Sequence, residues 1–217
     1  MKKYRLILAA FFIAILVVGC KQEEDITYYQ TLGVLQKTED STIIEADNNS
    51  RLLIENSSNL PATVKDDDRV FLYFSINDGP LPSGIDHLID IYSIEKVPVK
   101  PVFEITSYDE DSIGNDPLNV SGLWVAKDYL NLNFVFLGGT KTHLINLVKY
   151  PGELSSDTID LEIRHNDQDD NATNNLAGFL SFDLTSLQDE GKDSVTLCVK
   201  AREYDNRIFE NCYTYKY

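Results

Sequence analysis

The sequence predicts an all-β protein in two parts, a small OB-like barrel followed by an antiparallel β-sandwich. Three observations support this prediction. No amphipathic helix of ten or more residues is evident, short segments of alternating hydrophobicity recur along the chain, and Asn, Asp, Gly and Pro separate these segments. Hydrophobic residues make up 43% of the chain and aromatic residues 11%, which argues against disorder.

Five strand-like segments lie within residues 27–97, the range that we assign to the barrel. The alternation is clearest in the fourth segment, where Val70, Leu72 and Phe74 recur at every second position, as in a strand with one buried face. Five short strands in about 70 residues are typical of a small OB-type barrel. The expected strands are Tyr28–Leu35, Thr42–Ala46, Arg51–Asn56, Arg69–Ile76 and His87–Val97.

A second group of strand-like segments fills residues 102–217, which we assign to the sandwich. Two prolines three residues apart in Val97-Pro98-Val99-Lys100-Pro101 favour an extended chain, so we expect a stiff linker there. Gly138-Gly139 is expected to form a hairpin turn between two strands. Eight strands of this kind suggest an antiparallel sandwich. They are Val102–Thr106, Asn119–Ala126, Tyr129–Phe136, His143–Lys149, Thr158–His165, Leu176–Asp183, Ser194–Glu203 and Ile208–Lys216.

The amino-terminal segment is typical of a lipoprotein signal peptide. Three basic residues among the first five precede an apolar run, Leu6–Val18, whose thirteen residues fit the hydrophobic region of a signal peptide. A membrane-spanning helix needs roughly 20 residues. Gly19 then precedes Cys20, and the segment resembles the lipobox of bacterial lipoproteins. We therefore expect a signal peptide at 1–19 and a membrane anchor of lipid chains, palmitate among them, on Cys20. A plain secretory signal is the alternative.

An acidic segment follows the cysteine directly. Lys21-Gln22-Glu23-Glu24-Asp25 resembles the export tag that sends lipoproteins to the cell surface in the Bacteroidetes, although charge runs are ordinarily solvated linkers. We expect residues 20–26 to form an acidic tether. The protein is then anchored in the outer membrane and exposed at the cell surface, with the periplasmic face as the alternative.

The charge of the mature chain limits its partners. Without the signal peptide, 16 basic residues remain against 35 acidic ones, a net charge of −19. Such a chain repels nucleic acids and anionic lipid headgroups, because both bind proteins through cationic side chains. We therefore expect no nucleic-acid partner, and a protein or glycan partner at the cell envelope instead.

Several segments resemble the NigD-like lipoproteins: Asp67–Ile76, Ile113–Leu118, Leu123–Asn131, His143–Val148 and Leu161–Asn166. The resemblance covers nearly all of the mature chain. It implies an OB-like N-terminal domain and a C-terminal β-sandwich, in agreement with the strand pattern. It carries no catalytic motif. The family takes its name from a bacteriocin locus, so the resemblance also implies an alternative role as a bacteriocin-associated, immunity-type accessory protein.

We expect no catalytic residue, no metal ligand and no cofactor. The chain has no Gly-x-Ser-x-Gly elbow, His-Glu-x-x-His, phosphate loop or dinucleotide fingerprint. The histidines His87, His143 and His165 lack ligand spacing, and His143, which opens an apolar strand, is interpreted as a hydrogen-bonded structural residue. The acidic loops 108–116 and 167–171 offer oxygen ligands for calcium, but the second lacks the Gly and Glu of an EF-hand, and we interpret both as solvated loops.

Two functional hypotheses follow. The first is a non-enzymatic binding or accessory lipoprotein. The second, less favoured, is a hydrolase with an unrecognised carboxylate site, because two carboxylates about 5–10 Å apart can cleave glycosides. A deep cleft with convergent carboxylates would favour the enzyme, and an exposed aromatic patch would favour binding.

A disulfide is expected between Cys198 and Cys212. Once Cys20 carries lipid, these two cysteines remain, an even number in an oxidising compartment. The strands 194–203 and 208–216 form a hairpin around a three-residue loop, a register that places the two cysteines directly opposite each other. A one-residue shift would break this pairing. Two unlinked thiols on the solvent face are the alternative.

Overall fold

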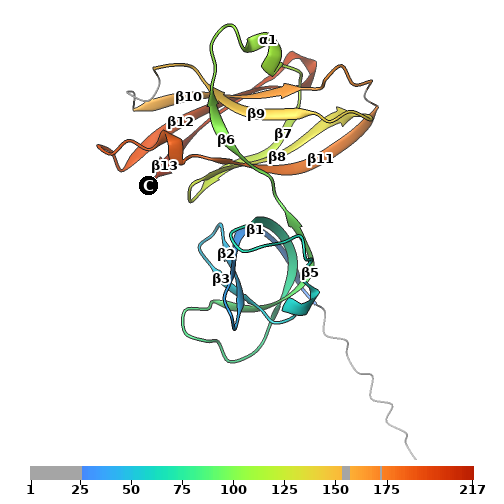
Figure 1. Ribbon diagram of the computed structural model, residues 1–217, viewed down its shortest axis with the longest axis vertical. Helices are drawn as coiled ribbons and strands as arrows, with labels where there is room; N and C mark the ends of the chain where they lie inside the picture. Colours follow the sequence, from blue (N-terminus) through green and yellow to red (C-terminus); the bar gives the residue numbers. More distant parts are fainter. Residues whose placement is uncertain (1–25, 153–156, 172) are drawn as a thin grey trace, which may run out of the picture.

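The computed structural model describes residues 26–152, 157–171 and 173–217. Over these residues the chain forms two β bodies joined end to end (Figure 1). The smaller, N-terminal body is a closed barrel, and the larger is a single strongly curled sheet. The predicted all-β class, a barrel followed by a β-sandwich, is therefore confirmed.

The barrel contains five strands within the described residues: β1 (Tyr28–Lys37), β2 (Thr42–Ala46), β3 (Arg51–Ile54), β4 (Arg69–Asn77) and β5 (His87–Lys96). Their order is β1-β2-β3-β5-β4, closing back onto β1, and only β3 and β5 run parallel among the barrel pairs. This is the arrangement of an OB fold. The ten residues of β1 pair with β4 along most of their length and with β2 along their second half.

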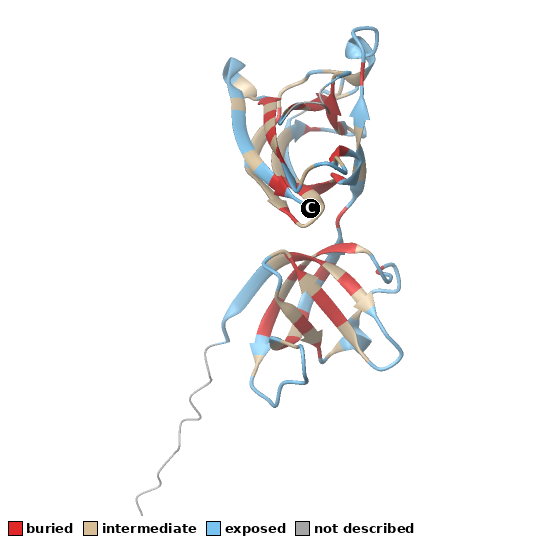
Figure 2. Cartoon of the chain, turned by 90° about the vertical axis from the view of Figure 1, so that its left-hand side faces the viewer, coloured by how far each residue is buried: buried red, intermediate tan, exposed pale blue. Residues whose placement is uncertain are grey.

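Closure of the barrel depends on a glycine in β1. Gly33 pairs with both Val70 and Ala46, so it lies where β1 passes from one neighbour to the other. A Cβ at this position would stand 2.5 Å from Ile44 Cγ2 and 2.9 Å from the Glu45 carbonyl oxygen. Only glycine therefore allows β2 to approach this closely. The apolar residues that point inward form the barrel core (Figure 2).

The C-terminal body comprises β6 (Val99–Glu104), α1 (Glu110–Ile113), β7 (Asn119–Ala126), β8 (Tyr129–Gly138), β9 (Leu144–Lys149), β10 (Thr158–Asn166), β11 (Asn174–Asp183), β12 (Ser194–Arg202) and β13 (Ile208–Lys216). The strand order is β13-β12-β10-β9-β6-β11-β8-β7. The sheet folds over itself, so that its two end strands approach each other and its halves face one another as in a sandwich (Figure 1). The core between these halves includes Leu130, Leu132, Leu147, Leu161, Phe182 and Leu197, each fully buried.

Three details differ from the sequence prediction. The sheet is mixed rather than antiparallel, because β6 runs parallel to both β9 and β11, and β10 runs parallel to β12. Residues 99–101, expected in a linker, begin β6 and pair with β11; an extended proline-containing segment and a strand share nearly the same backbone conformation. The Gly138-Gly139 hairpin prediction is wrong, since β8 pairs with β7 and β11 rather than with β9.

Candidate functional site

Arg69 joins the two bodies through a buried polar network. This residue opens β4 and is 2% exposed. Its Nη2 atom lies 2.6 Å from Asp47 Oδ1 and donates to Asn131 Oδ1 at 2.8 Å, while Nε donates to Ser181 Oγ at 3.3 Å. The guanidinium also lies over the ring of Tyr129, 4.8 Å from its centroid. Arg69 and Asp47 come from the barrel, and the other three side chains come from the sheet.

Asp47 is the shared acceptor of this network. Its Oδ2 atom accepts hydrogen bonds from Trp124 Nε1 at 3.1 Å and Asn131 Nδ2 at 3.3 Å, in addition to the guanidinium. A second ion pair crosses the junction, with Lys127 Nζ 3.2 Å from Glu45 Oε2. Trp124 is half-buried and donates across the junction. Because charges buried at a junction need their partners, the network holds the two bodies in one arrangement.

A groove lies beside this network, between the barrel and the sheet. Phe71 of β4 stacks on Phe179 of β11, with ring centroids 4.6 Å apart and planes inclined by 20°. The groove has a volume of about 440 Å³. Besides the two rings it is lined by Gln30, Glu95, Lys96 and Asn133, among others. Apolar walls with a few polar side chains are the usual composition of a binding site.

Away from the groove, three tyrosines extend the aromatic face of the barrel: Tyr28 and Tyr92, which are exposed, and the half-buried Tyr73. Tyr28 stacks on Tyr73 at 5.0 Å and meets Tyr92 edge-on at 4.8 Å between ring centroids. Tyr73 follows Phe71 by two residues on β4, so both rings project from the same side of that strand. An exposed cluster of aromatic side chains is a candidate interaction surface. The sequence already indicated that these rings face outward, because Phe71 and Tyr73 alternate with the buried residues Val70, Leu72 and Phe74.

His143 and His165 form a continuous hydrogen-bonded chain in the sheet. His165 Nδ1 lies 3.1 Å from the Pro117 carbonyl oxygen, His165 Nε2 lies 2.9 Å from His143 Nδ1, and His143 Nε2 lies 3.2 Å from Asp170 Oδ2. Phe136 stacks on His143 with centroids 4.4 Å apart. Both ends of the chain are acceptors, so all three hydrogen bonds form together only when the two rings share three N–H protons, with one ring protonated on both nitrogens. The two histidines are thus hydrogen-bonded structural residues, as predicted for His143.

The pKa values of His165 and Asp170 follow from the surroundings of these two side chains. Burial lowers the pKa of His165 below its usual range, and the nearby His143 lowers it further against the opposing effect of the Pro117 carbonyl. Burial raises the pKa of Asp170, but hydrogen bonds from His143 and from the backbone N–H groups of Thr140 and Gly139 outweigh it, so this pKa is lowered overall. The His143 and Asp170 side chains are only 3% and 4% exposed.

The two acidic loops lie against each other near these histidines. The Asp167 N–H donates to Asp116 Oδ2 at 2.9 Å, which joins the two loops. Lys141 Nζ donates to the carbonyl oxygens of Gln168 at 2.5 Å and Asp169 at 2.8 Å, so an ammonium group of the chain itself already occupies carbonyls that a cation would use. In the described part of the chain, no group of three or more His, Cys, Asp or Glu side chains is arranged to hold a metal ion.

The other predicted site residues divide into two sets. Cys20 and the export segment Lys21–Asp25 lie outside the described residues. Cys198 and Cys212 are directly opposed in the β12–β13 hairpin, as predicted, and the structure joins them by a disulfide with their Cα atoms 4.1 Å apart. The loop between these strands is the three-residue turn Tyr204–Asn206. Among the described residues, no helix has the length and apolar character to cross a membrane.

Three solved structures resemble this chain over 88% of its length. A protein of unknown function from Bacteroides vulgatus is 22% identical, with a TM-score of 0.72 and 91% of its own chain covered. A protein described as toxin related, from Parabacteroides distasonis, is 25% identical, with a TM-score of 0.70 and 93% covered. A NigD-like immunity protein from Bacteroides caccae is 19% identical, with a TM-score of 0.64 and 97% covered.

No curated protein matches the chain. The family model for the NigD-like C-terminal beta sandwich domain matches residues 100–217, which is more than half of the chain and coincides with the curled sheet. The resemblance noted in the sequence is therefore confirmed, and this chain belongs to the NigD-like family.

Proposed function

We propose that this protein is a non-enzymatic lipoprotein of the cell envelope that binds a protein partner in the groove between its two domains. The observation that carries the proposal is the Phe71–Phe179 ring pair, one ring from each domain, held in place by the buried Arg69 network. A groove between rigidly joined domains is preorganised, which lowers the entropic cost of binding.

The envelope location rests on the sequence. A short apolar run ending at Gly19-Cys20 supports lipidation of Cys20, and the acidic residues that follow support export to the cell surface. We place the chain in the outer membrane with its two domains facing outward. Intact mass of the protein purified from its host tests the anchor, because lipidation adds acyl chains to a chain that begins at Cys20. An unmodified mass would contradict it.

The surroundings of the His143–Asp170 pair favour a non-enzymatic role. A catalytic histidine needs one ring nitrogen oriented by a carboxylate and the other free to face a substrate or nucleophile. In this chain His143 Nε2 faces Asp170, and its Nδ1 is occupied by His165 rather than open to a substrate. Both members of the pair are buried, which also keeps substrates away.

A bacteriocin-associated accessory role is the specific form of this function that we favour. Two similar structures carry the descriptions immunity protein and toxin related, and both fit a function in which a protein is bound rather than a substrate transformed. Deletion of the gene followed by challenge with the cognate toxin tests this role. Unchanged sensitivity of the deletion strain would count against it.

Variants of the groove test the binding surface itself. Phe179→Ala removes one ring of the pair, while Phe103→Ala removes a ring that is 40% exposed on β6 and does not line the groove. We expect proximity crosslinking in the host to recover a partner with the wild type and with Phe103→Ala, and to lose it with Phe179→Ala. Recovery of the same partner with Phe179→Ala would exclude the groove, provided that the variant remains folded by circular dichroism.

A further inference from the structure

The end of the barrel where the described chain begins carries an exposed apolar and aromatic surface. Its members, which we call the tyrosine face, are Ile26, Tyr28, Tyr29, Ile76 and Tyr92, exposed by 55%, 43%, 44%, 39% and 51%. Four of the five line one hollow of about 600 Å³. The fifth, Tyr28, is tied to them by its edge-on contact with Tyr92. The groove at the domain junction does not account for this surface.

The length of chain before this face limits what can lie opposite it. Ile26 stands six positions after Cys20, and an extended chain spans at most about 3.5 Å per residue, so the two lie within about 20 Å of each other. A bilayer that holds a lipid on Cys20 is therefore always close to the tyrosine face. Helix α1 lies at the opposite end of the molecule, separated from the tyrosine face by the barrel and the sheet (Figure 1).

The side chains have the chemistry of a membrane–water interface. Tyrosine combines an apolar ring with a polar hydroxyl, and it is enriched at the headgroup level of membranes for that reason. The ring contacts of Tyr28 with Tyr73 and Tyr92 already restrict these side chains. Docking on a membrane therefore costs little further side-chain entropy. Asp78 and Asp90 border the same hollow, and their charge selects zwitterionic over anionic headgroups.

We propose that the tyrosine face rests on the interfacial layer of a zwitterionic phospholipid bilayer, and that it fixes the orientation of the protein on the membrane. This inference rests on the lipid anchor in the proposed function. The consequence is that the barrel lies on the membrane, while the sheet and its acidic loops stand away from it.

Chemical anchoring tests the inference independently of lipidation in the host. The mature chain is coupled through the Cys20 thiol to a maleimide lipid in phosphatidylcholine vesicles, because Cys198 and Cys212 are bridged and do not react. The reporter variant is Tyr92→Trp, and the matched control variant is Tyr108→Trp, at a 94% exposed position in the loop before α1. The native Trp124 gives the same background emission in both variants. Brominated phosphatidylcholine then quenches any tryptophan that reaches the interface.

We expect brominated vesicles to quench the added emission of the Tyr92→Trp variant and to leave that of the Tyr108→Trp variant unchanged. Adding Tyr28→Ser and Tyr29→Ser to the reporter, or Ile26→Ser if that variant does not fold, should reduce the quenching, as should anionic lipid. Equal quenching of the reporter and the control would overturn the inference. So would protection of the reporter by an envelope glycan or protein in the absence of lipid quenching. An unlipidated native protein would overturn the proposed anchor and leave this measurement unaffected.

Discussion

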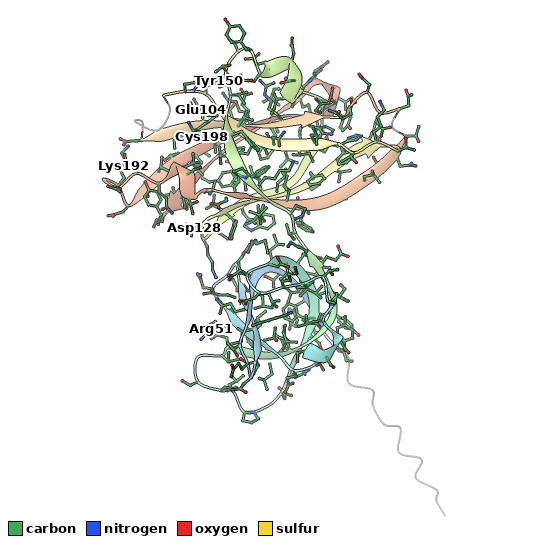
Figure 3. The ribbon with its side chains drawn as sticks, in the orientation of Figure 1. Arg51, Glu104, Asp128, Tyr150, Lys192 and Cys198 are labelled. Atoms are coloured by element: carbon green, nitrogen blue, oxygen red, sulfur yellow. A yellow bond between two sulfur atoms is a disulfide. The ribbon has the colours of Figure 1, made fainter. Side chains whose placement is uncertain are left out.

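Arg69 and Asp47 form an ion pair at the domain junction, with 2.6 Å between Nη2 and Oδ1 and side-chain exposures of only 1% and 12%. In Figure 3 the labelled Asp128, in the turn between β7 and β8, shows which part of the sheet lies nearest the barrel. Both charges belong to the barrel, but the atoms that complete their coordination belong to the sheet. The pair therefore depends on both domains, and both domains depend on the pair.

Replacing Arg69 by Met should strongly destabilise the protein. The change leaves the Asp47 carboxylate buried without its cation, which costs about 3–5 kcal/mol in the free energy of unfolding. The control is Lys96→Met, which breaks the Lys96–Asp68 pair where the lysine is 55% exposed and should cost at most about 1 kcal/mol. Urea unfolding measures both values. Similar costs for the two variants would show that the junction pair contributes no more than a surface pair.

The Cys198–Cys212 bridge should be present in the mature protein and should stabilise it. Alkylation of the unreduced protein is expected to leave both cysteines unmodified by mass spectrometry, and two adducts there would disprove the bridge. Replacing both residues by Ser should lower the free energy of unfolding by roughly 3 kcal/mol or less, because the two cysteines are 14 residues apart and close only a short loop.

Gly114 should not tolerate alanine. Its φ of +77° is unfavourable for any other residue, and a Cβ there would stand 2.6 Å from Asn166 Cβ and 2.8 Å from the His165 carbonyl oxygen. Gly152 also has a positive φ, +94°, but, apart from its chain neighbours, no atom of the described residues lies within 4 Å of a Cβ placed there. We expect Gly114→Ala to lower the melting temperature more than Gly152→Ala. Equal shifts would mean that backbone strain alone, and not the contact with β10, requires the glycine.

Acid should destabilise the protein in part through Asp109. Hydrogen bonds from the Thr106 N–H and hydroxyl to Asp109 Oδ2, both 2.8 Å, hold the pKa of this carboxyl below its usual range. A carboxyl with a lowered folded-state pKa contributes stability above its unfolded pKa of about 4 and loses it as the pH falls through the folded value. The urea midpoint should therefore fall less steeply below about pH 4 in Asp109→Asn than in the wild type. The control is Asp111→Asn in α1, which leaves both hydrogen bonds from Thr106 to Asp109 in place. A curve for Asp109→Asn that matches the wild type would contradict the assignment.

The acidic residues after Cys20 should determine surface exposure. Replacing Glu23, Glu24 and Asp25 by Ala should protect the protein from protease added to intact cells, while wild-type protein is cleaved. The control change Glu39→Ala, Asp40→Ala removes acidic charge from an exposed turn of the barrel and should leave cleavage unchanged. Wild-type protein that is already protected would place both domains in the periplasm and disprove surface exposure.

Most of the strands could be predicted from local pattern. The predicted bounds of β2, β7 and β13 agree with the structure, because alternation between core and solvent leaves a period of two in the sequence. The Cys198–Cys212 register was predictable for a similar reason. A short hairpin has few allowed loop lengths, and only one of them pairs the two cysteines.

The tertiary structure alone decided which distant strands become neighbours. The parallel pairs that β6 makes with β9 and β11 leave no local trace, because the paired residues are separated by 45 to 82 positions in the chain. The histidine chain depends on the β9–β10 pairing, and the Arg69 network and the Phe71–Phe179 pair join residues from different domains. The period of hydrophobic residues along the sequence therefore determined the strands of this protein. Its candidate sites form where polar and aromatic side chains that are distant in sequence come into contact, and no local sequence pattern predicts such contacts.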